Sequence, residues 1–250
     1  MWAGWIQDDK LGEGMYHPVI WENGIPRELE MPPLNYRDEP HWAGIMVRGM
    51  SADGSVLYGS TWDNNDRGMV YWKDGKVDYV GRDVRKTETV ELVDGLGQPY
   101  EYTLVCGMTV SNEKYNISPN GKYIAGTYRE EFLEGSRPGQ REYAGFFNTE
   151  TGETTVIRDL GEGGGITATD EGIGFMCIGT FLPSDCAVVD IDEGVVLGHL
   201  DEWARENYGV TLPAGYITDV APNGTLFGRT MLPDVATGAK TTDWYLAPAK

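Results

Sequence analysis

The sequence predicts an all-β fold that is built from one repeated antiparallel unit, and three observations lead to this prediction. An Asp-Gly or Asn-Gly turn, followed by a short apolar strand and a second glycine, recurs along the 250-residue chain. An apolar or aromatic triplet, usually with another turn behind it, follows each copy. The copies are spaced by roughly fifty to seventy residues, the length of a supersecondary repeat. Turns and strands this short do not suit a helical solenoid.

The clearest copy of the motif lies at residues 50–61. Asp53 and Gly54 are typical of a tight turn, because glycine accepts the positive φ and aspartate tolerates or caps it. Residues 55–58 favour a strand, and Gly59 ends it where a side chain has no room or the backbone bends. Two full copies, a degenerate copy and the tail of another lie at 118–127, 221–228, 170–180 and 2–5.

The triplets lie at 19–21, 70–72, 145–147, 188–190 and 244–246. One unit therefore holds three or four short strands, which is the size of a four-stranded propeller blade. The sequence predicts a single β-propeller-like domain over residues 1–250, with about five units of four-stranded antiparallel blades, the first of them truncated. The units are expected at 1–33, 41–82, 107–159, 163–200 and 216–248.

Two further elements are predicted between these units. Alternating residues on both sides of an Asp-Gly turn predict a β-hairpin insertion at 86–106. Residues 201–208 predict a helix, with Asp201 as its N-cap and Gly209 at its end.

Two polar segments are predicted to lack regular structure. The mixed charges of residues 129–142 favour a solvated loop. The glycine-rich run 161–165 lacks the Lys and Ser/Thr of a phosphate-binding loop, so it favours a flexible connector.

The composition excludes several classes of partner. A net charge of −19 at pH 7 argues against nucleic acid and anionic membrane surfaces, because both need clustered Lys and Arg. No apolar run approaches the length of a transmembrane helix, so membrane insertion is not expected, and no signal peptide is visible. Residue 1 falls inside a repeat, which leads us to expect a chain shortened at its N-terminus. The oligomeric state stays open.

The three cysteines allow at most one internal disulfide. Cys177 and Cys186 flank a turn-like segment and could pair across a hairpin, while two buried free thiols are the alternative. Cys106 lies in an apolar strand and is expected in the core.

The turn motif followed by a Val-Tyr-Trp strand, at 51–59 and 70–75, resembles the HAF repeats of bacterial extracellular and autotransporter-like proteins. The stretch 200–216 looks like the helix and loop that precede a last repeat there, although residues 172–179 depart from the usual spacing. The resemblance implies a propeller-like fold and an extracellular, cell-surface or periplasmic location. It implies no catalytic residues, because the motif residues are turn and core residues.

The residues just after each second glycine are expected at one common end of the units. Three successive units place an aromatic residue and then a carboxylate there. Aromatic rings stack on sugar rings and carboxylates accept hydrogen bonds from hydroxyls, so this end is a candidate carbohydrate site. The alternative is that the aromatic residues pack between units and the acids face water. The candidate residues are Trp5, Asp8, Trp62, Asp63, Tyr128, Glu130, Phe181 and Arg229.

A calcium site is the one metal site that the sequence suggests. Asp63, Asn65 and Asp66 supply oxygen ligands, but they lack the spacing of an EF-hand loop, so a turn stabilised by their side chains is the preferred interpretation. The three histidines are far apart and lack ligand spacing. We therefore expect no cofactor.

The function expected from these patterns is that of a non-enzymatic, exported binding or scaffold module, with a glycan or a protein bound on one face. A carbohydrate-active enzyme with a pair of carboxylates is the first alternative, although spacing along the chain cannot place two carboxylates face to face. A purely structural surface repeat is the second alternative.

Overall fold

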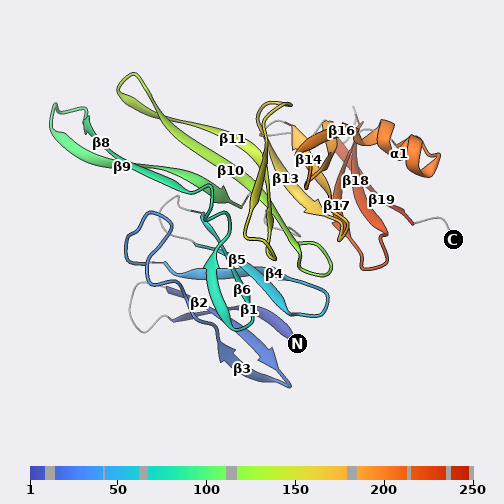
Figure 1. The fold of residues 1–250 in the computed structure, drawn as a ribbon, viewed down its shortest axis with the longest axis horizontal. Helices are drawn as coiled ribbons and strands as arrows, with labels where there is room; N and C mark the ends of the chain where they lie inside the picture. Colours follow the sequence, from blue (N-terminus) through green and yellow to red (C-terminus); the bar gives the residue numbers. More distant parts are fainter. Residues whose placement is uncertain are drawn as a thin grey trace.

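The computed structural model describes residues 1–8, 15–41, 43–61, 67–110, 117–178, 185–212, 215–234 and 238–247. These residues form antiparallel strands in five separate sheets, which follow one another along the chain (Figure 1). The all-β prediction is therefore confirmed. None of the five sheets closes on itself.

The first two sheets hold the N-terminal units. The strands of the first sheet, in spatial order, are β1 (Trp2–Asp8), β2 (Met15–Glu22) and β3 (Ile25–Glu28). Those of the second sheet are β4 (Ile45–Met50), β5 (Val56–Thr61), β6 (Met69–Lys73) and β7 (Lys76–Tyr79). Each sheet is a meander in which consecutive strands pair.

The third sheet combines the predicted hairpin with the third unit. Its strands are β8 (Lys86–Val93), β9 (Pro99–Thr109), β10 (Tyr123–Glu134), β11 (Arg137–Asn148) and β12 (Thr154–Ile157). The hairpin prediction at 86–106 is confirmed. In Figure 1 the β8–β9 and β10–β11 hairpins extend side by side, away from the other sheets.

The predicted loop at 129–142 is wrong, because β10 and β11 run through this segment. Arg129 lies opposite Glu142, and Glu130 lies opposite Arg141 in the ladder. The Arg129 Nη2 and Glu142 Oε1 atoms are 3.1 Å apart. Opposite charges that face each other across two strands stabilise the pairing, so mixed charge here belongs to a hairpin.

The last two sheets flank the helix. The strands of the fourth sheet are β13 (Gly163–Ala168), β14 (Ile173–Ile178), β15 (Asp185–Asp190) and β16 (Val195–His199), and those of the fifth are β17 (Gly215–Val220), β18 (Leu226–Asp234) and β19 (Gly238–Leu246). Helix α1 (Leu200–Tyr208) confirms the predicted helix, and Gly209 ends it in the left-handed conformation. The N-cap is His199 instead of Asp201, which lies in the first turn and favours the helix dipole from there.

The glycine-rich run is a strand and not a flexible connector. Gly163 and Gly165 belong to β13 and are buried. A Cβ atom at Gly165 would lie 2.9 Å from the carbonyl oxygens of both Gly126 and Gly145, so only glycine lets the fourth sheet approach the third this closely. Gly165 pairs with Met176 just before the register shift, as Val47 pairs with Gly59 and Ile217 with Gly228 in other sheets. Met176 therefore stands where those units have their second glycine.

The Asp-Gly turn of the second sheet is closed by a small network of hydrogen bonds. The Ser51 hydroxyl donates to Asp53 Oδ1 at 2.7 Å and accepts from the Val56 N–H at 3.0 Å. The Gly54 N–H donates to the Ser51 carbonyl at 2.9 Å, and its φ is +74°. This geometry explains why the motif pairs a serine with Asp-Gly.

The same network repeats in the third sheet, where Ser118 and Asn120 replace the serine and aspartate. Neighbouring turns are also bonded to one another. The Ala52 N–H donates to the Pro119 carbonyl at 2.7 Å, and the Asn120 N–H donates to Asp170 Oδ1 at 2.9 Å. The turns of the second, third and fourth sheets therefore form one continuous hydrogen-bonded row.

The Asp53 turn gives the protein an acid-dependent component of stability. Hydrogen bonds from the Ser55 N–H and from the Ser51 and Ser55 hydroxyls lower the Asp53 pKa to about 2. Because the folded pKa is below the unfolded value of about 3.9, this stabilisation is complete above pH 4 and is lost as the pH falls towards 2. We expect Asp53→Asn, which introduces the residue of the third sheet's turn, to flatten the fall in unfolding free energy between pH 4 and pH 2. Urea titrations of both proteins across this pH range measure the unfolding free energy. Parallel curves of unfolding free energy against pH would contradict the prediction.

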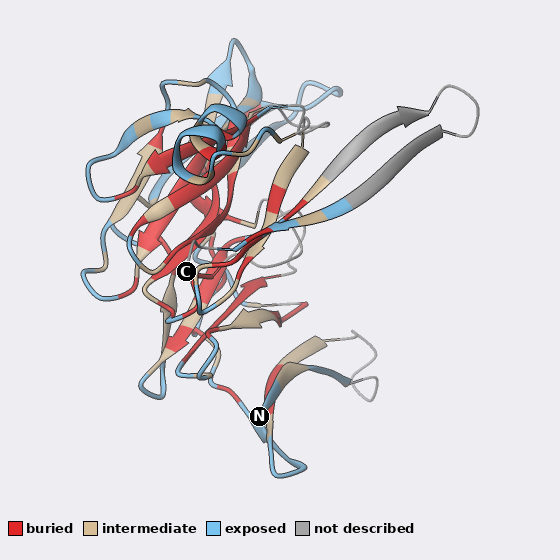
Figure 2. Ribbon diagram, turned by 90° about the vertical axis from the view of Figure 1, so that its right-hand side faces the viewer, coloured by how far each residue is buried: buried red, intermediate tan, exposed pale blue. Residues whose placement is uncertain are grey.

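The hydrophobic core lies between successive sheets, as four clusters of buried side chains. Each of the first four sheets packs against the following sheet through one cross-strand pair of residues. This pair lies next to the second glycine of the motif, or next to Met176 in the fourth sheet. The pairs are Ala3 with Ile20, Tyr58 with Tyr71, Ala125 with Phe146, and Phe175 with Val188. Figure 2 shows the buried residues concentrated along the strands.

The fifth sheet has an aromatic pair at the same place. Phe227 lies opposite Tyr245, but their side chains are 41% and 69% exposed. The first sheet is likewise exposed on its outer side at Trp2 and Ile6. Among the described residues, each end sheet therefore packs against another sheet on one face.

The segment between β3 and β4 joins the second and third sheets. The Tyr36 ring is buried between Gly68 and Gly107, where a Cβ atom at either glycine would overlap it. Its hydroxyl oxygen accepts a hydrogen bond from the Met108 N–H at 2.7 Å. Arg85 donates to the Tyr36 carbonyl from Nη2 at 2.7 Å.

The next residue, Arg37, forms a partly buried ion pair with Glu131 of the third sheet. Arg37 Nη2 lies 2.8 Å from Glu131 Oε1, and the two side chains are 17% and 7% exposed. Glu131 Oε2 also accepts the Val105 N–H at 3.0 Å. The Glu131 carboxylate therefore connects β9, β10 and the segment between β3 and β4. It lies where the two long hairpins begin to diverge.

Candidate functional site

The predicted carbohydrate end is only partly within the described residues. Trp62, Asp63 and Phe181 lie outside them, as do Asn65 and Asp66 of the suggested calcium site. Trp5 is half-exposed on β1, where its ring meets Tyr16 edge-on with centroids 6.5 Å apart. Asp8 is the last residue of the same strand.

The remaining predicted residues lie in structural contacts. Tyr128 is buried in the core between the second and third sheets, and the Arg158 guanidinium lies 5.3 Å from its ring centroid. Burial raises the pKa of the Tyr128 hydroxyl to about 12. Glu130 lies half-buried in β10, opposite Arg141. Arg229 donates to Asp243 at 2.7 Å, and both side chains are exposed. Among the described candidates, Tyr128 is thus part of the core and Arg229 is paired with Asp243, while the platform as a whole stays a prediction.

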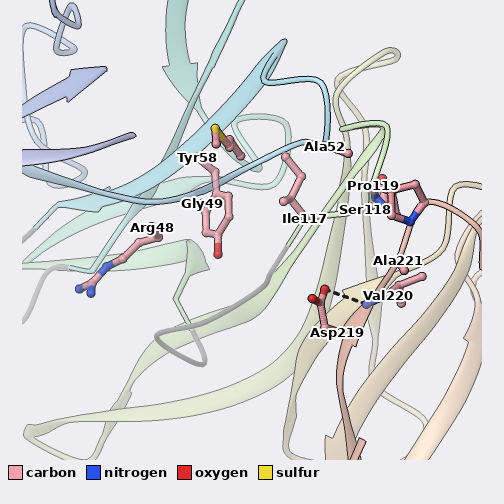
Figure 3. Close-up of a pocket in the computed structure, with 12 residues that line it drawn as sticks. Arg48, Gly49, Ala52, Tyr58, Ile117, Ser118, Pro119, Asp219, Val220 and Ala221 are labelled. Atoms are coloured by element: carbon pink, nitrogen blue, oxygen red, sulfur yellow. Dashed lines mark hydrogen bonds between the residues drawn. The ribbon is translucent and has the colours of Figure 1, made fainter. Parts of the chain in front are cut away.

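A cavity of about 370 Å³ lies at a different place, beside the Asp-Gly turns. Three sheets contribute to it, mainly through the strand or segment that precedes each turn (Figure 3). The lining residues are Arg48, Gly49, Met50, Ala52, Tyr58, Ile117, Ser118, Pro119, Asp219, Val220, Ala221 and Pro222. The fifth sheet therefore meets the second and third sheets here, although it is far from both in the sequence.

A repeated β-bulge shapes the strands around this cavity. The register shifts between Val47 and Gly49 in β4 and between Ile217 and Asp219 in β17. The first strand of the fourth sheet, β13, has the same irregularity at Ile166. In all three strands the extra residue lies at the same distance from the turn glycine. A bulge re-aims the side chains beside it, and in β4 and β17 the residues Arg48, Gly49 and Asp219 at the bulge line the cavity, whereas Ile166 of β13 packs in the core.

Asp219 is the one carboxylate among the described residues that line the cavity. Burial raises the pKa of its carboxyl group, and the hydrogen bond from the Val220 N–H acts in the opposite direction. The Val220 N–H to Asp219 Oδ1 distance is 2.8 Å. Figure 3 shows the carboxylate pointing towards the space between the second and fifth sheets. A partly desolvated carboxyl group of this kind accepts or donates hydrogen bonds strongly.

Tyr58 and Arg48 line the cavity from the second sheet. The Tyr58 ring packs against Gly49, where a Cβ atom would lie 2.6 Å from the ring. Arg48 Nε donates to Ser60 Oγ at 3.0 Å, which fixes the direction of the guanidinium. The cavity thus combines an aromatic ring, a carboxyl group and a nearby cation.

The sequence motif points to the residues after each turn and strand, whereas this site is formed mainly by residues before the turns, so it was not predicted. The sequence does contain a signal before the turns. Arg48 and Asp219 interrupt strands whose other residues are mostly apolar or small, namely Ile45–Met50 and Gly215–Val220. A charged residue in the first strand of a repeat, just before its turn, could have identified both.

Among the described residues, no group of three or more His, Cys, Asp or Glu side chains gathers in a way that could hold a metal ion. Within the same residues, α1 is too short and too polar to cross a membrane. No family model, curated protein or solved structure matches this chain.

Proposed function

We propose that this chain is a non-enzymatic binding module in which the five sheets act as blades of a propeller-like array and the ligand occupies the cavity beside the turns. The observation that carries the proposal is that three sheets direct equivalent segments into one cavity. Ligand sites are few, concave and lined by apolar groups with a small number of polar ones, and this cavity has that composition.

The ligand class that fits best is a glycan. The cavity volume of about 370 Å³ is at the lower end for small-molecule sites, which suits one or two sugar units. Asp219 offers an acceptor for sugar hydroxyls, and the apolar lining residues such as Met50 and Pro222 offer surface for the sugar's C–H groups. An exported location, which the HAF resemblance implies, is part of the proposal. A protein that docks at the same cavity is the alternative ligand.

A glycoside hydrolase at this cavity is less well supported. Such an enzyme requires two carboxyl groups about 5 to 10 Å apart on either side of the scissile bond. Asp219 is the one acidic residue among the described lining residues, so the second carboxyl group is missing from them. We therefore propose binding and not hydrolysis.

Replacing Asp219 with alanine tests the proposal. We expect wild-type protein to bind at least one member of a glycan panel, and Asp219→Ala to weaken that binding by about 10- to 100-fold, because a hydrogen bond to a charged or polarised acceptor contributes about 1.5–3 kcal/mol. Calorimetric titration of the glycan that binds measures the change.

The matched control is Glu150→Gln, which alters an exposed carboxylate on a turn of the third sheet. Circular dichroism and thermal melts establish that both variants are folded. Equal binding by Asp219→Ala and wild type would place the site elsewhere. A wild-type protein that binds no glycan would overturn the glycan proposal and leave protein docking or a structural role.

A further inference from the structure

Cys177 and Cys186 face each other directly across the fourth sheet. Cys177 is in β14 and Cys186 in β15, and their Cα atoms are partners in the antiparallel ladder. The two Sγ atoms are 2.8 Å apart. Both residues are buried, at 8% and 4% exposure. The thiols are therefore already held in contact by the pairing of the strands, before any bond forms between them.

The surroundings of the two thiols are apolar. They belong to the cluster between the fourth and fifth sheets, together with Leu200 and Ala204 of the helix. Cys106 is different, because it lies in the third sheet and its thiol approaches the Glu131 carbonyl at 3.6 Å. The chain therefore has one pre-formed pair of thiols and one separate thiol.

We propose that Cys177 and Cys186 form a cross-strand disulfide when the protein meets a small disulfide such as oxidised glutathione. Directly paired cysteines on neighbouring strands can be bridged without moving the backbone far. The inference rests on the geometry of β14 and β15 and is independent of the proposed ligand.

The reaction proceeds by two exchanges and balances. A Cys thiolate attacks one sulfur of the small disulfide, so that a mixed disulfide forms and one small thiolate leaves. The second cysteine thiolate then attacks the protein sulfur of the mixed disulfide and releases the second small thiolate. The two protein thiols lose their protons and are oxidised. The two small thiolates take up protons, and the small disulfide is reduced.

The exchange is expected to be slow at neutral pH. The hydrogen bond that the Cys177 thiol donates to the Cys186 sulfur and burial both raise the pKa of Cys177, which disfavours the reactive thiolate. Oxidation should therefore accelerate as the pH is raised. Once formed, the bond closes a short loop, which raises the midpoint of thermal unfolding by about 5–10 °C.

Thiol counting on the whole chain tests the proposal. After equilibration with oxidised glutathione and unfolding in denaturant, we expect the number of titratable thiols to fall from three to one. The intact mass should fall by about 2 Da, and peptide mapping should join Cys177 to Cys186. Three remaining thiols at every glutathione ratio, or a bridge that includes Cys106, would overturn the proposal.

Two variants provide matched controls. Cys106→Ser should still oxidise and retain no titratable thiol, while Cys186→Ser should form no internal bridge. Thermal melts of the oxidised and reduced wild type need no substitution, and equal midpoints would contradict the expected stabilisation. Disulfides persist in oxidising compartments. The oxidation state of protein taken from its native source would therefore also separate an exported location from a reducing one.

Discussion

Replacing Glu131 with alanine is expected to lower the free energy of unfolding by about 3–5 kcal/mol. The substitution removes the carboxylate that faces the largely but not fully buried Arg37 guanidinium at 2.8 Å. It also removes the acceptor of the Val105 N–H. A buried charge that loses its counter-charge keeps its desolvation cost, so the loss exceeds that of a surface ion pair. Chemical denaturation followed by circular dichroism measures it.

The matched control is Glu22→Ala, which breaks an ion pair with Arg27 in which both side chains are more than half exposed. Exposed pairs contribute less than about 1 kcal/mol. Similar losses for the two variants would show that the Arg37–Glu131 pair contributes no more than a surface contact. That result would remove its role in holding the long hairpins to the preceding segment.

Tyr36→Ala is expected to cost a similar amount, about 3–5 kcal/mol. The ring fills the space between Gly68 and Gly107, so its removal leaves a cavity between the second and third sheets. Tyr36→Phe keeps the ring and removes the acceptor of the Met108 N–H, which costs about 1–3 kcal/mol. Denaturant titrations of the two variants therefore separate packing from hydrogen bonding.

Tyr245→Ala is the control for Tyr36, since its ring is 69% exposed. We expect its unfolding midpoint to stay close to that of wild type. If Tyr36→Ala were as stable as Tyr245→Ala, the packing of the Tyr36 ring between two sheets would not contribute to stability.

The repeated turn could be predicted from the sequence because its chemistry is local. Asp53 and Gly54 need only their immediate neighbours to form the turn, and the same holds for the helix end at Gly209. The boundaries of the units followed from these turns. A turn or helix end of this kind can be predicted without knowing which residues pack against it.

The features that the sequence did not predict depend on distant residues. The role of Gly165 is set by the backbones of Gly126 and Gly145, which lie in another sheet. The pairing of Arg129 with Glu142 becomes visible only once the hairpin register is known. The cavity around Asp219 likewise needs the second, third and fifth sheets together. The neighbours of Gly165 and Asp219 lie in other sheets, so no single window of sequence contains them, whereas Arg129 and Glu142 share one short segment and only their pairing was not predicted.

The location of the core between successive sheets has a consequence for how the molecule opens. An interior sheet is held from both sides, whereas the first and fifth sheets each have one covered face. Where each unit packs mainly against its neighbours along the chain, the cost of detaching a unit is close to the sum of the interfaces that it loses. The two ends can therefore fray while the middle stays folded, so amide protons are protected least in the outer sheets and most in the third. The cavity, which is bounded partly by the fifth sheet, thus has one wall that opens more easily than the others.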